Sequence, residues 1–260
     1  MCLLVLAHGC RSDYPLIVVA NRDEFHERPA QAAHWWSDRR VFGGRDLRAG
    51  GAWFVVDGRG RFAAVTNFRN GQEVAGARSR GELPLRALAG ASTFGLEALA
   101  ASDDRYAAFN LLAGEVGHVS YVSNRCAPCA ELPRGIHGLS NGCLNAPWPK
   151  IQRARAMLGS VVQSPAAPTP ETLLDAVYDR HQPADELLPD TGIGIVRERL
   201  LSSPFIVSPE YGTRSTTALM VSASGTAIVS ERWYNPEGQA MTAHEERFEL
   251  VPTPDATADV

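Results

Sequence analysis

The chain is built largely from short apolar segments that come in pairs with turn-forming residues between them. Residues 2–8 and 16–20 form one pair, and residues 52–68 contain another around the turn sequence Asp57-Gly58-Arg59-Gly60. Runs rich in Leu, Val and Ile beside such turns are typical of β-hairpins. The sequence shows no alternation of strand and helix patterns, so a doubly wound parallel sheet is disfavoured. The pairing predicts antiparallel sheets.

The remaining segments extend this pattern and add helices. Further strands are predicted at residues 107–115, 118–124, 135–141, within 216–234 around Ser224-Gly225, and at 247–251. Helical spacing is predicted at residues 81–90, 93–100, 149–158 and 171–180, with residues 183–194 irregular. The glycines of residues 42–46 (FGGRD) are interpreted as a turn. Together these predict an α+β architecture with residues 1–260 as a single domain.

Composition narrows the classes of protein further. Of 260 residues, 45% are hydrophobic and 21% charged, and the formal net charge of −4 gives no reason to expect nucleic acid as a partner. No stretch approaches the roughly 18 apolar residues of a membrane span. The first apolar run is short and lacks a preceding positive region, so a cytoplasmic location is expected. Five cysteines, an odd count in a chain of this size, argue against a disulfide framework.

Cys2 directly follows the initiator methionine. Because residue 2 is small, Met1 is removable, and its removal would leave a cysteine that carries both a thiol and a free α-amino group. An α-amino group with a pKa near 7.7–8.0 can act as the base for its own thiol, so no catalytic histidine is needed. The alternative is that Cys2 only packs as a small hydrophobic residue at the start of a strand.

Four polar residues, Asn21-Arg22-Asp23-Glu24, end the second apolar run. An arginine near a thiol stabilises the thiolate, and an aspartate can orient the terminal amine. Strand alternation places Arg22 on the face opposite Asn21 and Asp23, so their convergence on one point requires a bend. The alternative is a surface cluster of salt bridges at the start of a loop.

Two asparagines end other predicted strands. Asn67 lies in AAVTNF and Asn141 in HGLSN. Amide N–H groups at such positions can donate to a developing oxyanion, although asparagine is also a common turn residue. Trp35 and Trp36 can form the floor of an apolar pocket, and the alternative is that they only pack against other residues of the fold.

The sequence C-A-P-C at residues 126–129 has redox or metal spacing. The second pair that a zinc site would need is missing, and His137 or Cys143 would complete a site only by an accident of folding. We therefore expect no metal site.

A set of motifs, in order along nearly the whole chain, resembles the NRDE family, which is named for that tetrapeptide and typified by transport and Golgi organisation protein 2. The matching segments are MC at the start, ANRDEFHERP, GGAWF, AVTNF, SRGELP, HGLSN followed by PWPK, and YGTRSTT. The resemblance implies the N-terminal nucleophile hydrolase fold, a four-layer αββα sandwich. Its cysteine relatives include bile-salt hydrolases, penicillin V acylases and acyl-CoA-dependent acyltransferases.

By position, the resemblance implies roles for the residues of a site. They are the nucleophile Cys2, its supports Arg22 and Asp23, the oxyanion candidates Asn67 and Asn141, and the more distant support Arg214. The relatives separate the arginine from the aspartate, whereas Arg22 and Asp23 are adjacent here. Asn21 or Glu24 is the alternative for one of these two roles.

Two functions follow as hypotheses. The first is hydrolysis or acyl transfer at an amide or thioester bond through Cys2 after removal of Met1, with no cofactor required. The second is a carrier for haem or an acyl-CoA-like ligand, since NRDE proteins have been discussed as haem-handling or lipid-related factors. For the carrier, His8, His26 and His34 offer axial ligands, and Trp35 and Trp36 offer stacking surfaces.

Overall fold

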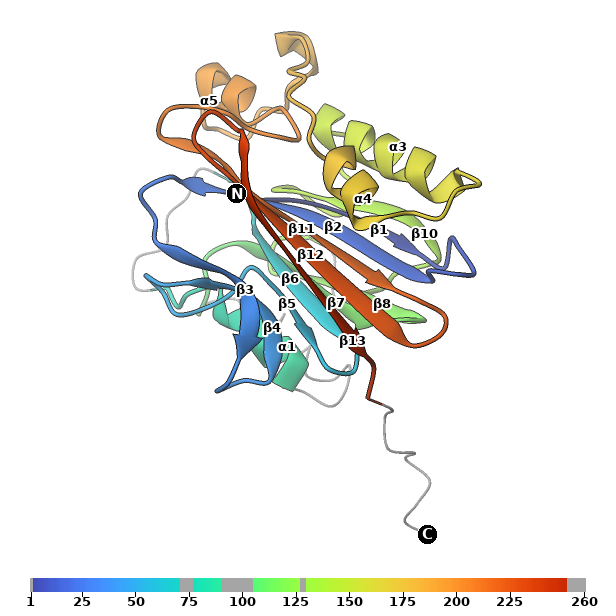
Figure 1. Cartoon of the computed structure of the whole chain (residues 1–260). Coiled ribbons are helices and arrows are strands. Elements are labelled where there is room, and N and C mark those ends of the chain that lie inside the picture. The colour runs from blue at the N-terminus through green and yellow to red at the C-terminus, as the bar shows by residue number, and fades with distance from the viewer. Residues whose placement is uncertain (1, 71–76, 90–104, 127–129, 252–260) are drawn as a thin grey trace.

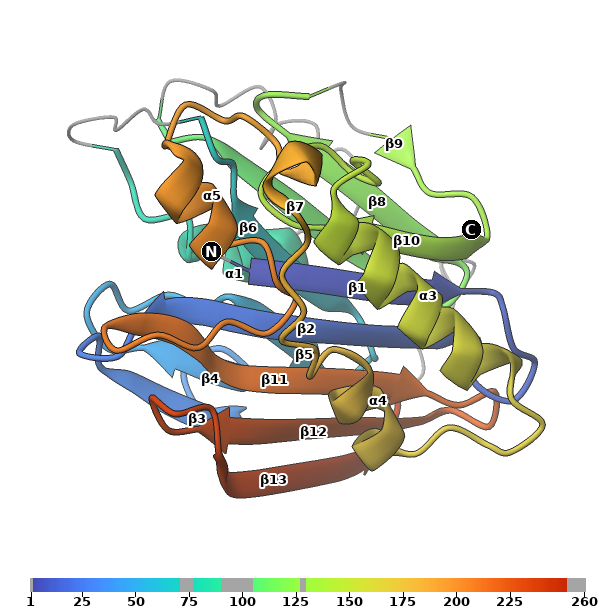
Figure 2. The ribbon, with the colours of Figure 1, turned by 90° about the horizontal axis from the view of Figure 1, so that it is seen from above.

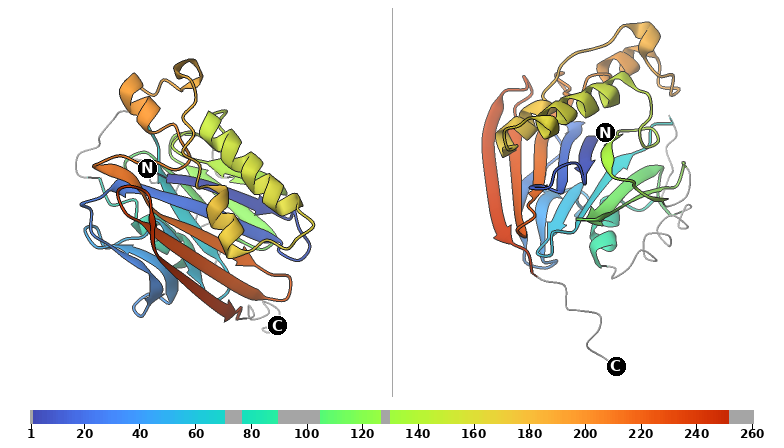
Figure 3. Two further views of the ribbon diagram at one scale, coloured as in Figure 1. Left: turned by 45° about the horizontal axis from the view of Figure 1, so that its top comes forward. Right: turned by 90° about the vertical axis from the view of Figure 1, so that its right-hand side faces the viewer.

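The computed structural model describes residues 2–70, 77–89, 105–126 and 130–251. Within these residues the chain forms two antiparallel β-sheets that pack face to face, with helices on the outer faces (Figures 1 and 3). The predicted α+β class is confirmed, and so is its αββα layering. The assignment of residues 1–260 to one domain stays a prediction.

The first sheet has six strands in the spatial order β10-β1-β2-β11-β12-β13 (Figure 2). Its strands are β1 (Cys2–His8), β2 (Leu16–Phe25), β10 (Gly135–Leu139), β11 (Tyr211–Val221), β12 (Thr226–Tyr234) and β13 (Ala240–Glu249). The long central strands β2 and β11 pair with each other, although nearly 190 residues separate the register partners Phe25 and Tyr211. The first sheet therefore joins both ends of the chain.

The second sheet has seven strands that follow one another in chain order. They are β3 (Ala30–Trp36), β4 (Val41–Asp46), β5 (Phe54–Asp57), β6 (Phe62–Asn67), β7 (Phe109–Glu115), β8 (His118–Ser123) and β9 (Ala130–Glu131). Each strand pairs antiparallel with the next, as expected for a succession of hairpins.

The described helices lie on the two outer faces. They are α1 (Glu82–Ala89), α3 (Pro149–Gln163), α4 (Pro170–Ala176), α5 (Ile195–Leu200) and the short 3-10 helix η1 (Asp185–Leu187). Helix α3 lies over β10 and β1, and α4 lies over β11 and β12 (Figure 2). Helix α1 covers the second sheet. In the part of the chain that the structure describes, no helix is long and apolar enough to cross a membrane.

Alternation along the strands produces three apolar cores. In β1, Leu4 and Leu6 pack between the two sheets, whereas Leu3 and Val5 pack under the helices. The third core lies between the second sheet and α1, where Leu83 is fully buried. Side chains of successive strand residues point to opposite faces, so a strand covered on both faces is apolar throughout. This explains the unbroken apolar runs of β1 and of the first half of β2.

Most predicted elements are confirmed, and the exceptions have clear causes. Residues 42–46 form most of β4 rather than a turn. Gly43 and Gly44 are there because a Cβ on Gly43 would lie 2.4 Å from the Phe54 carbonyl oxygen, and one on Gly44 would lie 2.1 Å from the ring of Trp53. Strands β3 and β9 and helix α5 were not predicted, because each lacks a clear apolar period. The helix predicted at residues 93–100 lies outside the described residues.

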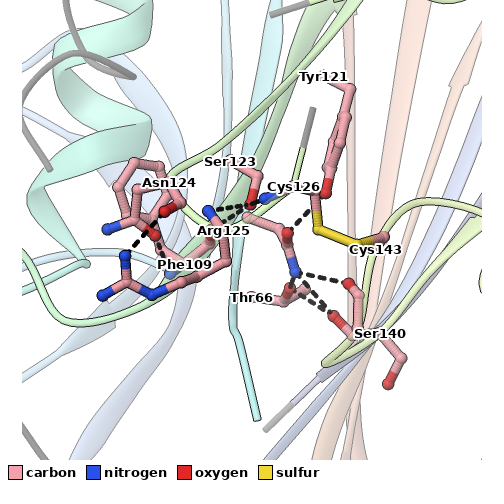
Figure 4. Close-up of a disulfide and its surroundings, with 11 residues drawn as sticks. Thr66, Phe109, Tyr121, Ser123, Asn124, Arg125, Cys126, Ser140 and Cys143 are labelled. Atoms are coloured by element: carbon pink, nitrogen blue, oxygen red, sulfur yellow. Dashed lines mark hydrogen bonds between the residues drawn. A yellow bond between two sulfur atoms is a disulfide. The ribbon is translucent and has the colours of Figure 1, made fainter. Parts of the chain in front are cut away.

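The cysteine count argues against a disulfide framework, but the described residues do contain one disulfide, which joins Cys126 and Cys143 (Figure 4). The bond ties the end of β8 to the segment that follows β10. Hydrogen bonds hold the same segment: Thr66 Oγ1 donates to the Ser140 carbonyl oxygen at 2.6 Å. Asn110 Nδ2 donates to the Gly142 carbonyl oxygen at 2.9 Å. Residues 140–143 are thus fixed against the second sheet.

Candidate active site

Cys2 is the first residue of β1 and pairs with Arg22 of β2. It lies at the end of the first sheet, where the gap between the sheets opens into a cavity of about 540 Å³. The cavity walls come from both sheets and from the segment that leads into α1. Besides Cys2, the charged and amide residues that line it are Arg22, Asp23, Glu24, Arg28, Asp46, Asn67, Arg78 and Arg80.

Arg22 points into the space between the sheets, on the same side as Cys2. Its guanidinium carbon lies 4.2 Å from the ring centroid of Trp53, and its Nη2 lies 3.4 Å from Asp46 Oδ2. Asp46 also accepts a hydrogen bond of 2.6 Å from Arg28 Nε. The ring and the carboxylate fix the Arg22 side chain, which is 4% exposed. A positive charge is therefore held in place beside the thiol.

Asp23 points to the opposite, helix-covered face of β2. Its Oδ1 accepts a hydrogen bond of 2.7 Å from Thr213 Oγ1 of β11. Thr213 lies opposite Asp23 because β11 carries a β-bulge at Arg214: the register passes from Thr213–Asp23 to Ser215–Arg22. Burial raises the pKa of Asp23 to about 6, although Lys150, Thr213 and Arg69 act in the opposite direction. At neutral pH the carboxyl group is ionised and ready to accept protons or hydrogen bonds.

The thiol of Cys2 is not activated by its surroundings alone. Burial raises the pKa of Cys2, whereas the backbone N–H of Asp23 and the Arg22 guanidinium lower it. Burial is the larger effect, so the thiol is neutral at physiological pH. A reaction at this sulfur therefore needs a base close by.

The two predicted asparagines are neighbours but differ in what their side chains do. Asn67 ends β6 and lines the cavity with Cys2, and its side-chain amide makes no hydrogen bond within the described residues. Asn141 is fully buried, and its Nδ2 donates to the Asn67 carbonyl oxygen at 2.8 Å. Ser140 Oγ donates to the Cys2 carbonyl oxygen at 3.0 Å. Asn67 therefore faces the cavity, while Ser140 and Asn141 hold Cys2 and Asn67 in position.

Behind these residues lies a buried ion pair that sequence analysis missed. Arg69 Nη1 lies 2.5 Å from Glu198 Oε2 of α5, and both side chains are at most 3% exposed. Arg69 Nη2 lies 3.5 Å from Asn141 Oδ1, and the Arg69 backbone N–H donates to the Asn141 carbonyl oxygen at 2.7 Å. The pair therefore joins α5 to the asparagines of the site.

Lys150, at the start of α3, is a second buried charge that sequence analysis did not select. Its Nζ donates to the Leu201 carbonyl oxygen at 3.0 Å. Burial and the nearby Arg69 lower the pKa of Lys150 to about 7, against the attraction of Asp23. A signal for it was present: Lys150 is the only lysine of the chain and belongs to the PWPK motif.

Two other predicted residues of the first sheet serve the fold around the site. Asn21 Nδ2 donates to the carbonyl oxygens of Val177, which follows α4, and of Pro204, which follows α5, so Asn21 anchors both of these segments to the sheet. Arg214 donates to the carbonyl oxygens of Phe25 and Arg28 and does not line the cavity. Both lie close to the site without facing it.

Glu24, Trp35 and Trp36 lie in different places. Glu24 lines the Cys2 cavity and lies 3.7 Å from Arg28. Trp35 and Trp36 line a separate cavity of about 790 Å³ on the second sheet, beside α1.

The haem and metal expectations involve other residues than those of the Cys2 site. None of the chain's histidines lines the Cys2 cavity, and haem binding stays a prediction. Among the described residues, no group of three or more His, Cys, Asp or Glu side chains is arranged to hold a metal ion.

Among solved structures, the chain is similar to the C2A mutant of conjugated bile acid hydrolase from Clostridium perfringens. The identity is 9%, the TM-score is 0.49, and the match covers 98% of this chain and 100% of that one. It is also similar to the Caenorhabditis elegans orthologue of N-acylethanolamine-hydrolyzing acid amidase, with 7% identity, a TM-score of 0.48, and 84% and 92% of the two chains covered.

Sequence comparison gives closer relatives. The Transport and Golgi organization protein 2 homolog of Homo sapiens is 32% identical over 241 residues, covering 85% of this chain and 87% of that protein. The Bos taurus homolog is 31% identical over 262 residues, covering 92% and 95%. The model of the family described as Transport and Golgi organisation 2 matches residues 1–236. The resemblance noted in the sequence is therefore confirmed, and the chain belongs to the Transport and Golgi organisation 2 family.

Proposed function

We propose that this protein is a hydrolase or acyltransferase that cleaves an amide or thioester bond through Cys2 after Met1 has been removed. The observation that carries the proposal is the position of Cys2. As the first residue of β1, it opens onto a cavity that Arg22, Asp23 and Asn67 also line. A thiol, a cation, a carboxylate and an uncommitted amide are the groups that acyl transfer through a cysteine requires.

Removal of Met1 would supply the missing base. It turns the backbone nitrogen of Cys2 into an α-amino group, whose ordinary pKa is about 7.7–8.0. That amine takes the thiol proton, which offsets the burial that keeps the Cys2 pKa high. Asp23 lies beside the register partner of Cys2, where its carboxylate stabilises the resulting ammonium.

The reaction then proceeds in two steps. The thiolate attacks the acyl carbonyl carbon, a C–S bond forms, and the negative charge on the carbonyl oxygen accepts a hydrogen bond from the Asn67 side-chain amide. The tetrahedral intermediate breaks its bond to the leaving amine or thiol, which takes the proton from the ammonium. Water or an acyl acceptor then attacks the acyl-Cys2 thioester and restores the thiol.

Intact mass and an acyl adduct test the proposal. The mass of untagged protein is expected to be lower by one methionine, and an acyl thioester substrate is expected to leave its acyl group on Cys2. The Cys2→Ala variant should lose turnover while keeping its melting temperature. The matched control is Cys10→Ala, because Cys10 is the other free cysteine among the described residues and is exposed. Turnover that persists in Cys2→Ala, or active protein that retains Met1, would refute this mechanism.

A further inference from the structure

The charges that line the Cys2 cavity do not balance one another. Arg28 pairs with Asp46 at 2.6 Å and lies 3.7 Å from Glu24. Arg22 shares Asp46 at 3.4 Å. The cations on this side of the cavity thus compete for two carboxylates.

Arg80 has no carboxylate partner within the described residues. It lies in the segment before α1 and lines the cavity, half-buried. Its Nη1 donates one hydrogen bond of 3.1 Å, to the neutral carbonyl oxygen of Ala108. Its neighbour Arg78 differs, because Arg78 Nη2 lies 2.5 Å from Glu82 Oε2. A guanidinium has five donors, so Arg80 retains most of its hydrogen-bonding capacity.

The half-buried position of Arg80 makes a charge without a carboxylate partner unfavourable. Burial lowers the pKa of Arg80, and its electrostatic neighbours include Cys2 and Glu24. A partly desolvated cation without a counter-ion is unfavourable, and an anion that enters the cavity would relieve that cost. Because Arg80 and Cys2 line the same cavity, such an anion would lie in the cavity onto which the sulfur opens.

Arg22 gives a second, independent indication. Its Nη1 is buried and has no hydrogen-bond acceptor among the residues that the structure describes, and the side chain as a whole is 4% exposed. Buried donors are nearly always paired in proteins, so an unpaired one beside a cavity indicates a ligand that supplies the acceptor. Two guanidinium groups with spare donors therefore line the cavity into which Cys2 opens.

We propose that Arg80 binds an anionic oxygen group of the substrate, a carboxylate or a phosphate, while Cys2 attacks the acyl carbon of the same molecule. This inference rests on the proposed function and specifies its substrate class: acyl compounds that carry a negative charge near the scissile bond. The volume of about 540 Å³ is sufficient for such a group and part of an acyl chain.

Matched substrates test this directly. N-decanoylglycine and N-decanoylglycinamide share the scissile amide and differ in one carboxylate. The S-decanoyl thioesters of 2-mercaptoethyl phosphate and of 2-mercaptoethanol share the thioester and differ in one phosphate, which is joined to the sulfur through two carbons. We expect kcat/KM to favour the charged member of at least one pair by roughly 10- to 100-fold, the range of a charge-assisted hydrogen bond. The pair that shows the preference identifies the anion.

Arg80→Met should abolish that preference, so that the kcat/KM values of the charged and neutral members of the pair agree within about twofold. Arg80→Lys keeps the positive charge but loses the paired N–H donors of the planar guanidinium, so it should retain part of the preference. Arg48→Met is the control for general electrostatic attraction, because Arg48 is exposed near the cavity and does not line it. Its preference should match that of the unmodified protein. Circular dichroism and melting temperature establish that each variant is folded.

The outcomes separate this inference from the proposed function. Equal turnover of charged and neutral substrates would overturn the anion site and leave the Cys2 mechanism standing. If no substrate is turned over, calorimetric titration of N-decanoylglycine and of the S-decanoyl thioester of 2-mercaptoethyl phosphate into the Cys2→Ala variant decides. Binding that is lost on adding Arg80→Met supports the anion site without catalysis, whereas no binding, or binding that survives Arg80→Met, refutes it.

Discussion

Replacing Glu198 by glutamine should destabilise the protein strongly, because it removes one charge of a buried ion pair. The Arg69 and Glu198 side chains are 2% and 3% exposed, and 2.5 Å separates Nη1 from Oε2. Breaking such a pair leaves a charge that neither water nor a partner compensates, which costs about 3–5 kcal/mol. Glutamine keeps the shape of the side chain and an acceptor for the N–H of Thr191. The loss therefore reports mainly on the missing charge.

Urea unfolding and thermal melting measure the effect. For a protein of this size, 3–5 kcal/mol corresponds to a fall in melting temperature of roughly 10 °C. The control is Asp185→Asn, which removes an exposed ion pair with Arg199. Arg199 lies in α5 next to Glu198, and the loss of this pair should cost no more than about 1 kcal/mol. Replacing both buried charges, in Arg69→Met/Glu198→Leu, should restore most of the stability. A loss below about 1 kcal/mol in Glu198→Gln would show that water reaches Arg69 and would refute the reasoning.

Three further predictions concern the site and its supports. Asn67→Ala should lower kcat by about 10²- to 10³-fold with little change in KM, measured with an acyl substrate, if its amide binds the oxyanion. Replacing both Cys126 and Cys143 by alanine should cost about 3 kcal/mol in urea unfolding, because the disulfide closes a loop with a separation of 17 residues; a reducing agent should then have no further effect. Burial lowers the pKa of Lys150 from 10.5 to about 7, so the unfolded chain binds more protons between these values and stability rises with pH across that window. Lys150→Met should reduce this slope by about 1.4 kcal/mol per pH unit between about pH 7.5 and pH 9, and an unchanged slope would contradict the assignment.

Elements with a strong local pattern could be predicted from the sequence, and those fixed by distant contacts could not. The hairpin β5–β6 has apolar runs on either side of Asp57-Gly58-Arg59-Gly60, so its turn identifies it. Strand β4 has two glycines that mimic a turn, and their reason is the close approach of Phe54 and Trp53, which lie on or next to another strand. The disulfide was missed for a similar reason: the odd number of cysteines gives no pairing, and the contact depends on where β8 and β10 lie.

The residues of the site could be predicted where they lie at the end of an apolar run in the sequence. They could not be predicted where two charged residues far apart in the sequence form an ion pair. Cys2, Arg22, Asp23 and Asn67 all lie at the ends of apolar runs, and all line one cavity. Arg69 and Glu198 are 129 residues apart, and neither stands out beside its neighbours in the sequence. Only the packing of α5 against the segment after β6 shows that they are partners.

The adjacency of Arg22 and Asp23 looked like an obstacle to a common site, because neighbours on a strand point to opposite faces. A common site does not require a bend in β2, because Cys2 is the first residue of β1. Once Met1 is removed, the chain would end at Cys2, so its thiol and its terminal nitrogen could reach different faces of the sheet. Its thiol is on the same face as Leu4, toward the space between the sheets, where Arg22 lies. Removal of Met1 would create an α-amino group at the end of the strand, and we propose that Asp23, which follows Arg22 on β2, stabilises it. A cysteine within the strand would reach one of these residues but not both. Adding a single residue between Met1 and Cys2, in protein from which Met1 has been removed, should therefore abolish turnover as fully as Cys2→Ala does, although the thiol, Arg22 and the fold are unchanged. Turnover that survives this insertion would show that the α-amino group and Asp23 take no part in the reaction.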